Sequence, residues 1–347
     1  MKWIFAISVL VGLGACASKE EAADFSYRPD ETVVDSEGKI TGVNLEMPNK
    51  EIDSTDLDSI NGLNAEWVSL VPYGFTARGE AKVQYGTRYQ WWGETVEGTI
   101  SIANDAHAVG QKVMIKPHVW VVGDGWPGQF DLDTEAEWKV WEESYRDYIL
   151  KFAEIADSVD ADLYCIGTEY RNAAKKREAF WRQLIKEVRE IYDGPVTYAA
   201  NWDNHERVKF WDALDYIGID GYFPVSKEQE PSYEVIKEGW EGVSSDLKSF
   251  SEKYDKQILF TEYGFRSCDF AVSGMQDDKT GVANMTNQFN AYRAFFETIW
   301  KEDFFAGGFL WKWTFSPNEN NSGLSNARYT PQGKPAFELI AEVYGGR

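Results

Sequence analysis

Short apolar runs alternate with amphipathic stretches from residue 40 onward, and this alternation limits the folds open to the chain. Eight of the runs have the length and composition of buried strands. They lie at 40–46, 67–73, 112–119, 162–169, 195–201, 216–222, 257–262 and 307–313. Because strands that alternate with helices form parallel sheets, the pattern predicts an α/β protein, a single (β/α)8 TIM barrel over residues 40–347.

The intervening stretches have the spacing of helices. The clearest begins at Thr134, where Glu137 three residues later completes a capping box. Apolar residues then recur at helical spacing from Trp138 to Ile155, which predicts a face packed on a barrel. A doubly wound open sheet is the alternative fold. It is disfavoured because no Gly-x-Gly-x-x-Gly or phosphate-binding loop follows a strand.

The first 39 residues differ in character from the rest. Residues 1–15 combine Lys2, an apolar run and small residues, which predicts a secretory signal peptide. Their ending, followed by Cys16, resembles a bacterial lipobox and implies lipid attachment at that cysteine. Residues 16–39 are polar and acidic, which predicts a flexible tether. We therefore expect a bacterial lipoprotein anchored in the outer membrane, on the cell surface or in the periplasm.

Charge and composition exclude several classes of partner. The formal net charge of −22 argues against binding to nucleic acid, and against membrane contact other than through the lipid anchor. Three cysteines provide no disulfide framework, and three histidines without clustered spacing predict no zinc or other metal site. We expect a monomer without a cofactor.

Two of the predicted strands end in the same way, with Glu followed by Tyr. Glu169 closes the fourth strand and Glu262 closes the seventh. Because barrel active sites form at the carboxyl ends of the strands, we expect both glutamates at one mouth. Glycoside hydrolysis requires two carboxyl groups: one protonates the leaving oxygen, and the other attacks the anomeric carbon or activates water. We therefore predict that Glu169 and Glu262 are catalytic.

Polar and aromatic residues at the other strand ends are candidates for binding a sugar. They are Asn44, Lys116, His118, Trp120, Asn201, Trp202, Asp220, Tyr222, Trp311 and Trp313. We expect Trp313 to stack on the sugar at the cleavage point. Tyr222 is expected to hydrogen-bond Glu262, and Lys116 either to contact a hydroxyl group or to neutralise a carboxylate.

Long loops beside the strand ends add further candidates. Trp126 lies in one that is expected to line an outer sugar subsite. The segment 74–94, which contains Trp91 and Trp92, is expected to set how much of a polymer is bound.

The order of the strand ends resembles clan A of the retaining glycoside hydrolases, and within it glycoside hydrolase family 113, the β-mannanases. The resemblance covers residues 40–345 and is carried by Gly42-Val43-Asn44, Lys116-Pro117-His118-Val119-Trp120, Gly167-Thr168-Glu169, Gly218-Ile219-Asp220-Gly221-Tyr222, Phe260-Thr261-Glu262-Tyr263-Gly264 and Phe309-Leu310-Trp311-Lys312-Trp313. It implies that Glu169 is the general acid/base and Glu262 the nucleophile. Many clan members carry Asn where this chain has Thr168. Either Thr168 or an amide such as that of Asn201 is therefore expected to contact the sugar 2-hydroxyl group.

The resulting expectation is a retaining glycoside hydrolase that acts on β-1,4-mannan or its oligosaccharides. Three alternatives stay open: the same mechanism on another neutral β-glycan such as β-glucan or xylan, an exo-acting β-mannosidase, and a non-catalytic surface lipoprotein that binds glycans. The presence of both glutamates argues against the last of these.

Overall fold

The computed structural model describes residues 34, 36–123, 125–274, 281–318 and 322–346. The predicted signal peptide, the predicted lipidation site at Cys16 and most of the predicted tether lie outside the described residues. None of the helices that the structure describes is long and apolar enough to cross a membrane.

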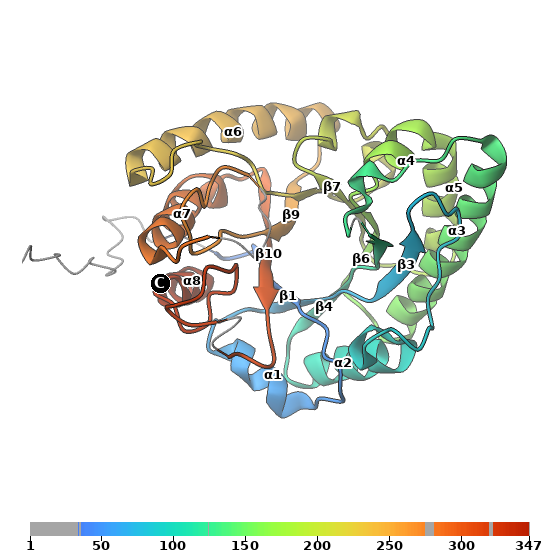
Figure 1. Cartoon of the computed structure of the whole chain (residues 1–347), viewed down its shortest axis with the longest axis horizontal. Coiled ribbons are helices and arrows are strands. Elements are labelled where there is room, and N and C mark those ends of the chain that lie inside the picture. Colours follow the sequence, from blue (N-terminus) through green and yellow to red (C-terminus); the bar gives the residue numbers. More distant parts are fainter. Residues whose placement is uncertain (1–33, 35, 124, 275–280, 319–321, 347) are drawn as a thin grey trace, which may run out of the picture.

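Eight parallel strands close into a barrel, as predicted (Figure 1). They are β1 Ile40–Leu45, β2 Trp67–Leu70, β4 Lys112–Ile115, β6 Leu163–Thr168, β7 Val196–Asn201, β8 Ile217–Asp220, β9 Ile258–Tyr263 and β10 Phe305–Trp313. Each strand pairs with the next barrel strand in the sequence, and β10 pairs with β1 to close the barrel. All carboxyl ends therefore lie at one mouth.

Two of the predicted strands are each divided in two by a proline. The run 67–73 becomes β2 and β3 Tyr73–Ala77, and the run 112–119 becomes β4 and β5 His118–Val122. Pro72 and Pro117 lie at the breaks, where a residue without an N–H group interrupts the ladder. β3 and β5 pair with each other outside the barrel sheet, from Tyr73 opposite His118 to Ala77 opposite Val122. We call this pair the β3–β5 ribbon.

Helices surround the barrel (Figure 1). They are α1 Ser54–Asn61, α2 Val96–Ala108, α3 Glu135–Ser158, α4 Arg171–Lys176, α5 Glu178–Arg189, α6 Tyr233–Tyr254, α7 Met285–Glu297 and α8 Ala336–Tyr344. The capping box between Thr134 and Glu137 is present at the start of α3. The connection after β7 is an exception to the alternation, because it contains only the short 3₁₀ helices η3 His205–Arg207 and η4 Trp211–Ala213. Further 3₁₀ helices are η1 Trp92–Glu94, η2 Pro127–Gln129 and η5 Ile299–Lys301.

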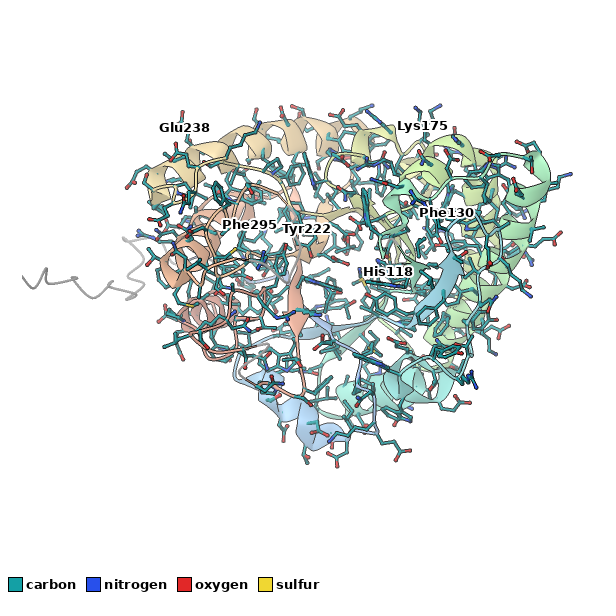
Figure 2. All side chains as sticks on the ribbon, in the orientation of Figure 1. His118, Phe130, Lys175, Tyr222, Glu238 and Phe295 are labelled. Atoms are coloured by element: carbon teal, nitrogen blue, oxygen red, sulfur yellow. The ribbon has the colours of Figure 1, made fainter. Side chains whose placement is uncertain are left out.

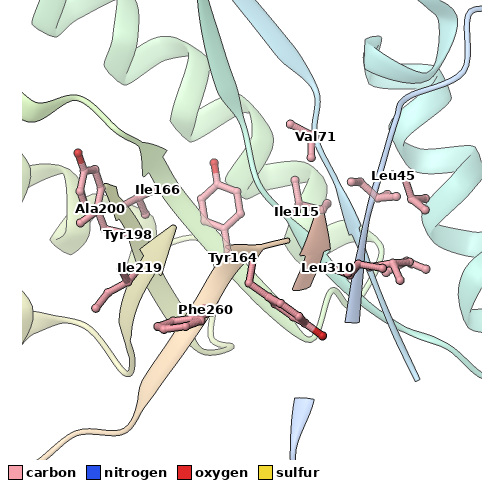
Figure 3. Packing of buried hydrophobic residues seen from close by; sticks show 14 of the residues in the cluster. Leu45, Val71, Ile115, Tyr164, Ile166, Tyr198, Ala200, Ile219, Phe260 and Leu310 are labelled. Carbon is pink, nitrogen blue, oxygen red and sulfur yellow. The ribbon is translucent and has the colours of Figure 1, made fainter. Parts of the chain in front are cut away.

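Buried apolar residues form two clusters in the described residues. The larger lies between the strands and the helices, and Figure 3 shows part of it, including Tyr164 and Phe260. The smaller draws on the barrel strands β1, β4, β6, β7, β9 and β10, with Met114, Cys165 and Leu259 among its members, as expected for the interior of a barrel. Cys165 is fully buried and free, so it fills space as a small apolar residue.

Candidate active site

Glu169 lies immediately after β6 and accepts two hydrogen bonds. Asn201 Nδ2, at the end of β7, donates to Oε1 over 2.6 Å, and Trp126 Nε1 donates to Oε2 over 2.6 Å. The residue is 5% exposed, and its φ of 54° lies in the left-handed region, which is rare for a residue with a Cβ atom. Such strained positions are concentrated at functional sites.

The environment of Glu169 favours its protonated form. Burial, and next the negative charge of Glu262, raise the pKa of Glu169 to about 7, although the Trp126 and Asn201 donors act in the opposite direction. A carboxyl group with a pKa near neutrality is suited to act as a general acid. The effect of Glu262 also indicates that the two carboxyl groups lie within electrostatic range of each other.

Glu262 in β9 is held by two donors, one after β4 on the opposite side of the barrel and one after the neighbouring strand β8. Lys116, in the break between β4 and β5, forms an ion pair with Oε1, and the Tyr222 hydroxyl group donates to Oε2 over 2.9 Å. Lys116 is fully buried and Glu262 is 4% exposed. The predicted Tyr222 contact is therefore present, and of the two roles predicted for Lys116 the structure shows neutralisation of a carboxylate.

The charges around Lys116 keep it protonated. Burial opposes its charged form, but the negative charges of Glu262 and Asp220 outweigh burial and raise the pKa of Lys116. Burial, and next the charge of Glu262, raise the pKa of Asp220 well above its usual value. Lys116 therefore supplies the positive charge that compensates Glu262 in this buried site.

An open cleft of about 340 Å³ adjoins the ion pair of Lys116 and Glu262. Tyr73 and Trp311 line the cleft, whereas Glu169 and Glu262 do not. The Trp311 ring centre lies 5.7 Å from Lys116 Nζ. Burial, and next the charge of Glu262, raise the pKa of Tyr73, so this tyrosine lies within electrostatic range of Glu262. The cleft therefore begins on the Glu262 side of the two glutamates.

The structure corrects the predicted role of Trp313. Its side chain is 2% exposed and packs against Phe337 at the start of α8, with ring centres 6.3 Å apart, so it is not placed to stack on a sugar. Trp311, two residues earlier, is the indole that reaches the cleft. Residues two apart in a strand share a face, but β10 is irregular here, because its pairing with β1 shifts register between Leu310 and Trp313.

Asn44 and Asp220 are also too deep to contact a sugar directly. Both are fully buried. The Asn44 amide donates to the backbone oxygen atoms of Thr261 and Phe309, and Thr261 Oγ1 donates to Asp220 over 2.8 Å. Both predicted binding residues instead position the strands next to Glu262.

The remaining predicted residues lie at the mouth. His118 and Tyr222 lie around the centre of the barrel, whereas Lys175 and Glu238 lie on its rim (Figure 2). Burial, and next the charge of Lys116, lower the pKa of His118 to about 3, so its imidazole is neutral. Trp120 is 48% exposed and lines the cleft.

The structure shows which side chains the predicted amide and indole residues contact within the protein. Asn201 reaches Glu169, whereas Thr168 is 1% exposed and its hydroxyl group has no partner among the described residues. Trp202 packs against Phe223 with ring centres 5.9 Å apart. Trp126, expected at an outer subsite, donates to Glu169.

Glu94 is a cleft residue that the sequence analysis missed. It is 7% exposed, and burial raises its pKa to about 7. The signal in the sequence was weak, because a glutamate three residues after Trp91 resembles an ordinary capping residue, and it does accept the Trp91 N–H group. Within the residues that the structure describes, no group of three or more His, Cys, Asp or Glu is placed to hold a metal ion.

A parallel barrel with two buried carboxyl groups at one mouth, one favouring its protonated form and the other facing a cation, defines a glycoside hydrolase active site. The sequence model of Glycoside Hydrolase Family 113 matches residues 47–334. The chain belongs to this family. The predicted fold, family and enzyme class are therefore confirmed.

Solved structures agree with this assignment. The family 113 β-mannanase AaManA from Alicyclobacillus acidocaldarius, in complex with ManMIm, is similar with a TM-score of 0.78 and 26% identity, covering 90% of this chain and 99% of that chain. A second family 113 β-1,4-mannanase complex has a TM-score of 0.78 and 26% identity, covering 89% and 99%. A β-glucuronidase from an uncultured Clostridium sp. shares the fold, with a TM-score of 0.60 and 16% identity, covering 89% of this chain and 50% of that chain. No curated protein matches the chain.

Proposed function

We propose that the protein hydrolyses β-1,4-mannosidic bonds in mannan and mannooligosaccharides by double displacement, with retention of configuration. The observation that carries the proposal is the contrast between the two glutamates. Glu169 has a pKa of about 7, whereas Glu262 faces the Lys116 ammonium group and the Tyr222 hydroxyl group. Environments that separate two carboxyl groups in this way assign one as acid and the other as nucleophile. The β-mannanases among the similar structures support the choice of substrate.

The first step forms a covalent glycosyl-enzyme. A Glu262 carboxylate oxygen attacks the anomeric carbon, and the bond to the glycosidic oxygen breaks. Glu169 transfers its proton to that oxygen, so the leaving chain departs as an alcohol. Glu262 loses its negative charge in this step, because its carboxylate becomes an ester.

The second step uses the same residue in the opposite role. Once Glu262 is esterified, its charge no longer raises the pKa of Glu169, so the Glu169 carboxylate becomes a better match for a general base. It takes a proton from water while the water oxygen attacks the anomeric carbon and releases Glu262. The enzyme returns to its initial protonation state.

The product anomer tests this proposal. Mannohexaose is incubated with the protein, and proton NMR follows the newly formed reducing ends before they mutarotate. Initial release of the β-anomer is expected, whereas initial release of the α-anomer contradicts double displacement. Parallel incubations with β-glucan, xylan and an aryl β-mannoside test the substrate. Faster release of reducing ends from β-glucan or xylan than from mannan would contradict the mannan assignment.

We further propose that lipid attachment at Cys16 anchors the enzyme in the outer membrane. The lipobox-like ending of the leader and the acidic segment 16–39 support this location.

A further inference from the structure

Three hollows lie side by side at one side of the barrel mouth. The cleft of about 340 Å³ shares Glu46 and Trp91 with a hollow of about 180 Å³. The cleft of about 340 Å³ also shares Tyr89 and Trp120 with a third hollow of about 480 Å³, which extends over the β3–β5 ribbon. Because neighbouring hollows share wall residues, they adjoin one another and together form one row. We call it the ribbon groove.

The turn that carries Trp91 is held in place by hydrogen bonds. Gln90 Nε2 donates to the backbone oxygen atoms of Tyr73, over 2.7 Å, and of Glu94, over 3.1 Å. The Trp91 N–H group donates to Glu94 Oε2 over 3.1 Å. A fixed turn presents its indole with little conformational entropy left to lose on binding.

Three aromatic side chains of the groove face solvent. Tyr89 is 71% exposed, Trp91 is 47% exposed and Trp120 is 48% exposed. Aromatic side chains with this much exposed surface mark a contact site when they gather in one concave region. Flat rings of this kind match the C–H faces of pyranose sugars.

The polar groups of the groove suit a neutral ligand. Lys312 Nζ and Glu46 Oε1 lie 2.7 Å apart, so their charges offset each other. Glu94 is 7% exposed and is an acceptor for a hydroxyl group. A chain with uronate groups would be repelled by the net charge of −22.

The groove lies on the side of the scissile bond away from the acid. A general acid protonates the departing oxygen, so Glu169 and its donors mark the side of the leaving group. Neither Glu169 nor its donors Asn201 and Trp126 line the groove. The groove instead meets the catalytic centre through Tyr73 and Trp311, on the Glu262 side.

We propose that the ribbon groove binds the sugar units on the glycone side of the scissile bond, where Trp91 and Trp120 stack on sugar rings and Glu94 accepts a hydrogen bond from a sugar hydroxyl group. The site takes neutral β-linked sugar units. The proposal rests on the function proposed above and deepens it, because it makes the rate depend on the number of units on one side of the cleaved bond.

Two substrates with the same leaving group test the site. 4-Nitrophenyl β-mannoside and 4-nitrophenyl β-1,4-mannotrioside differ only on the glycone side. The ratio of kcat/KM for the trioside to that for the mannoside is expected to fall roughly tenfold in Trp91→Ala, as for the loss of one stacking contact. It is expected to recover in part in Trp91→Phe, which restores a flat ring. Glu94→Gln is expected to lower the ratio about threefold, since the amide is a weaker acceptor than the carboxylate.

Tyr254→Ala is the matched control, because this partly exposed tyrosine lies at the end of α6, at the opposite end of the barrel from the mouth. The ratio of kcat/KM for the trioside to that for the mannoside should be the same in this variant as in the wild type. An unchanged ratio in folded Trp91→Ala, or equal losses on both substrates, would overturn the proposal. Slower cleavage of mannohexaose with an unchanged ratio would place the groove on the leaving-group side and also overturn it.

Failure of the proposed mannan hydrolysis would be seen in the wild-type protein, before any variant is compared with it. If it cleaves another neutral β-glycan, the same pair of aryl glycosides made with that sugar applies the same test. A wild-type protein that cleaves none of these glycans overturns both proposals.

Discussion

Lys116 and Glu262 form a buried ion pair at the mouth of the barrel, and the Tyr222 hydroxyl group binds the second oxygen atom of the same carboxylate. A purely structural carboxylate would show a similar pairing. The pair gains a catalytic meaning from its position, because a cleft begins beside Lys116 and Glu169 lies within electrostatic range.

Replacing Lys116 with methionine is expected to lower both stability and activity. Glu262 would be left as a buried charge without its partner, which costs about 3 kcal/mol in the free energy of unfolding. The value of kcat should fall roughly a hundredfold or more, because the charge that orients the nucleophile is lost. Chemical denaturation and mannohexaose kinetics measure the two effects.

The double variant Lys116→Met with Glu262→Gln is the control for that experiment. Removal of both charges should restore most of the lost stability without restoring activity. A Glu262→Gln single variant with wild-type kcat would show that the pair is only structural and would contradict the assignment of Glu262.

Replacing Glu169 with alanine is expected to affect substrates according to their leaving group. An alcohol leaving group needs a proton, so hydrolysis of mannohexaose should fall by about 10³-fold or more. Formation of the glycosyl-enzyme from a 4-nitrophenyl glycoside needs little acid assistance, so its burst phase should be largely retained. Rapid-mixing kinetics measure the rate of glycosyl-enzyme formation from each substrate. An equal loss of this rate for mannohexaose and for the 4-nitrophenyl glycoside would contradict the role of Glu169 as the acid.

The alkaline limb of the pH profile is expected to report Glu169. Because the protonated form is the acid, kcat/KM should fall as pH rises through about 7, the pKa of this group. The Trp126 N–H group lowers that pKa, so Trp126→Phe should raise it and move the limb to higher pH. The measurement is kcat/KM for mannohexaose from pH 4 to pH 9. A limb that moves to lower pH in Trp126→Phe would contradict the assignment.

Replacing Cys16 with serine is expected to release the enzyme from the membrane. A serine side chain cannot carry the thioether-linked lipid, so the variant should appear in the soluble fraction of the expressing bacterium. Cell fractionation and incorporation of radiolabelled palmitate measure the change, and Cys268→Ser is the matched control. Palmitate labelling that persists in Cys16→Ser would contradict lipid attachment at this position.

The sequence by itself determined the fold class and the positions of Glu169 and Glu262 at the barrel mouth. These follow from local information, because buried strands carry continuous apolar runs and parallel strands bring their carboxyl ends to one mouth. A glutamate that ends such a strand, at 169 or at 262, was therefore placed correctly without knowledge of any contact. The Tyr222 contact to Glu262 followed from the same rule, since β8 and β9 are neighbours.

Only the tertiary structure decided which side chains reach the cleft. The alternation along β10 did not distinguish Trp311 from Trp313, because that choice depends on the local backbone and on packing against α8. The prolines at 72 and 117 detach the ends of two strands and build the β3–β5 ribbon, which is one wall of the groove. Glu94 joins that groove from a turn distant in the sequence from both glutamates. Contacts of this kind arise from long-range packing, and local sequence patterns do not encode them.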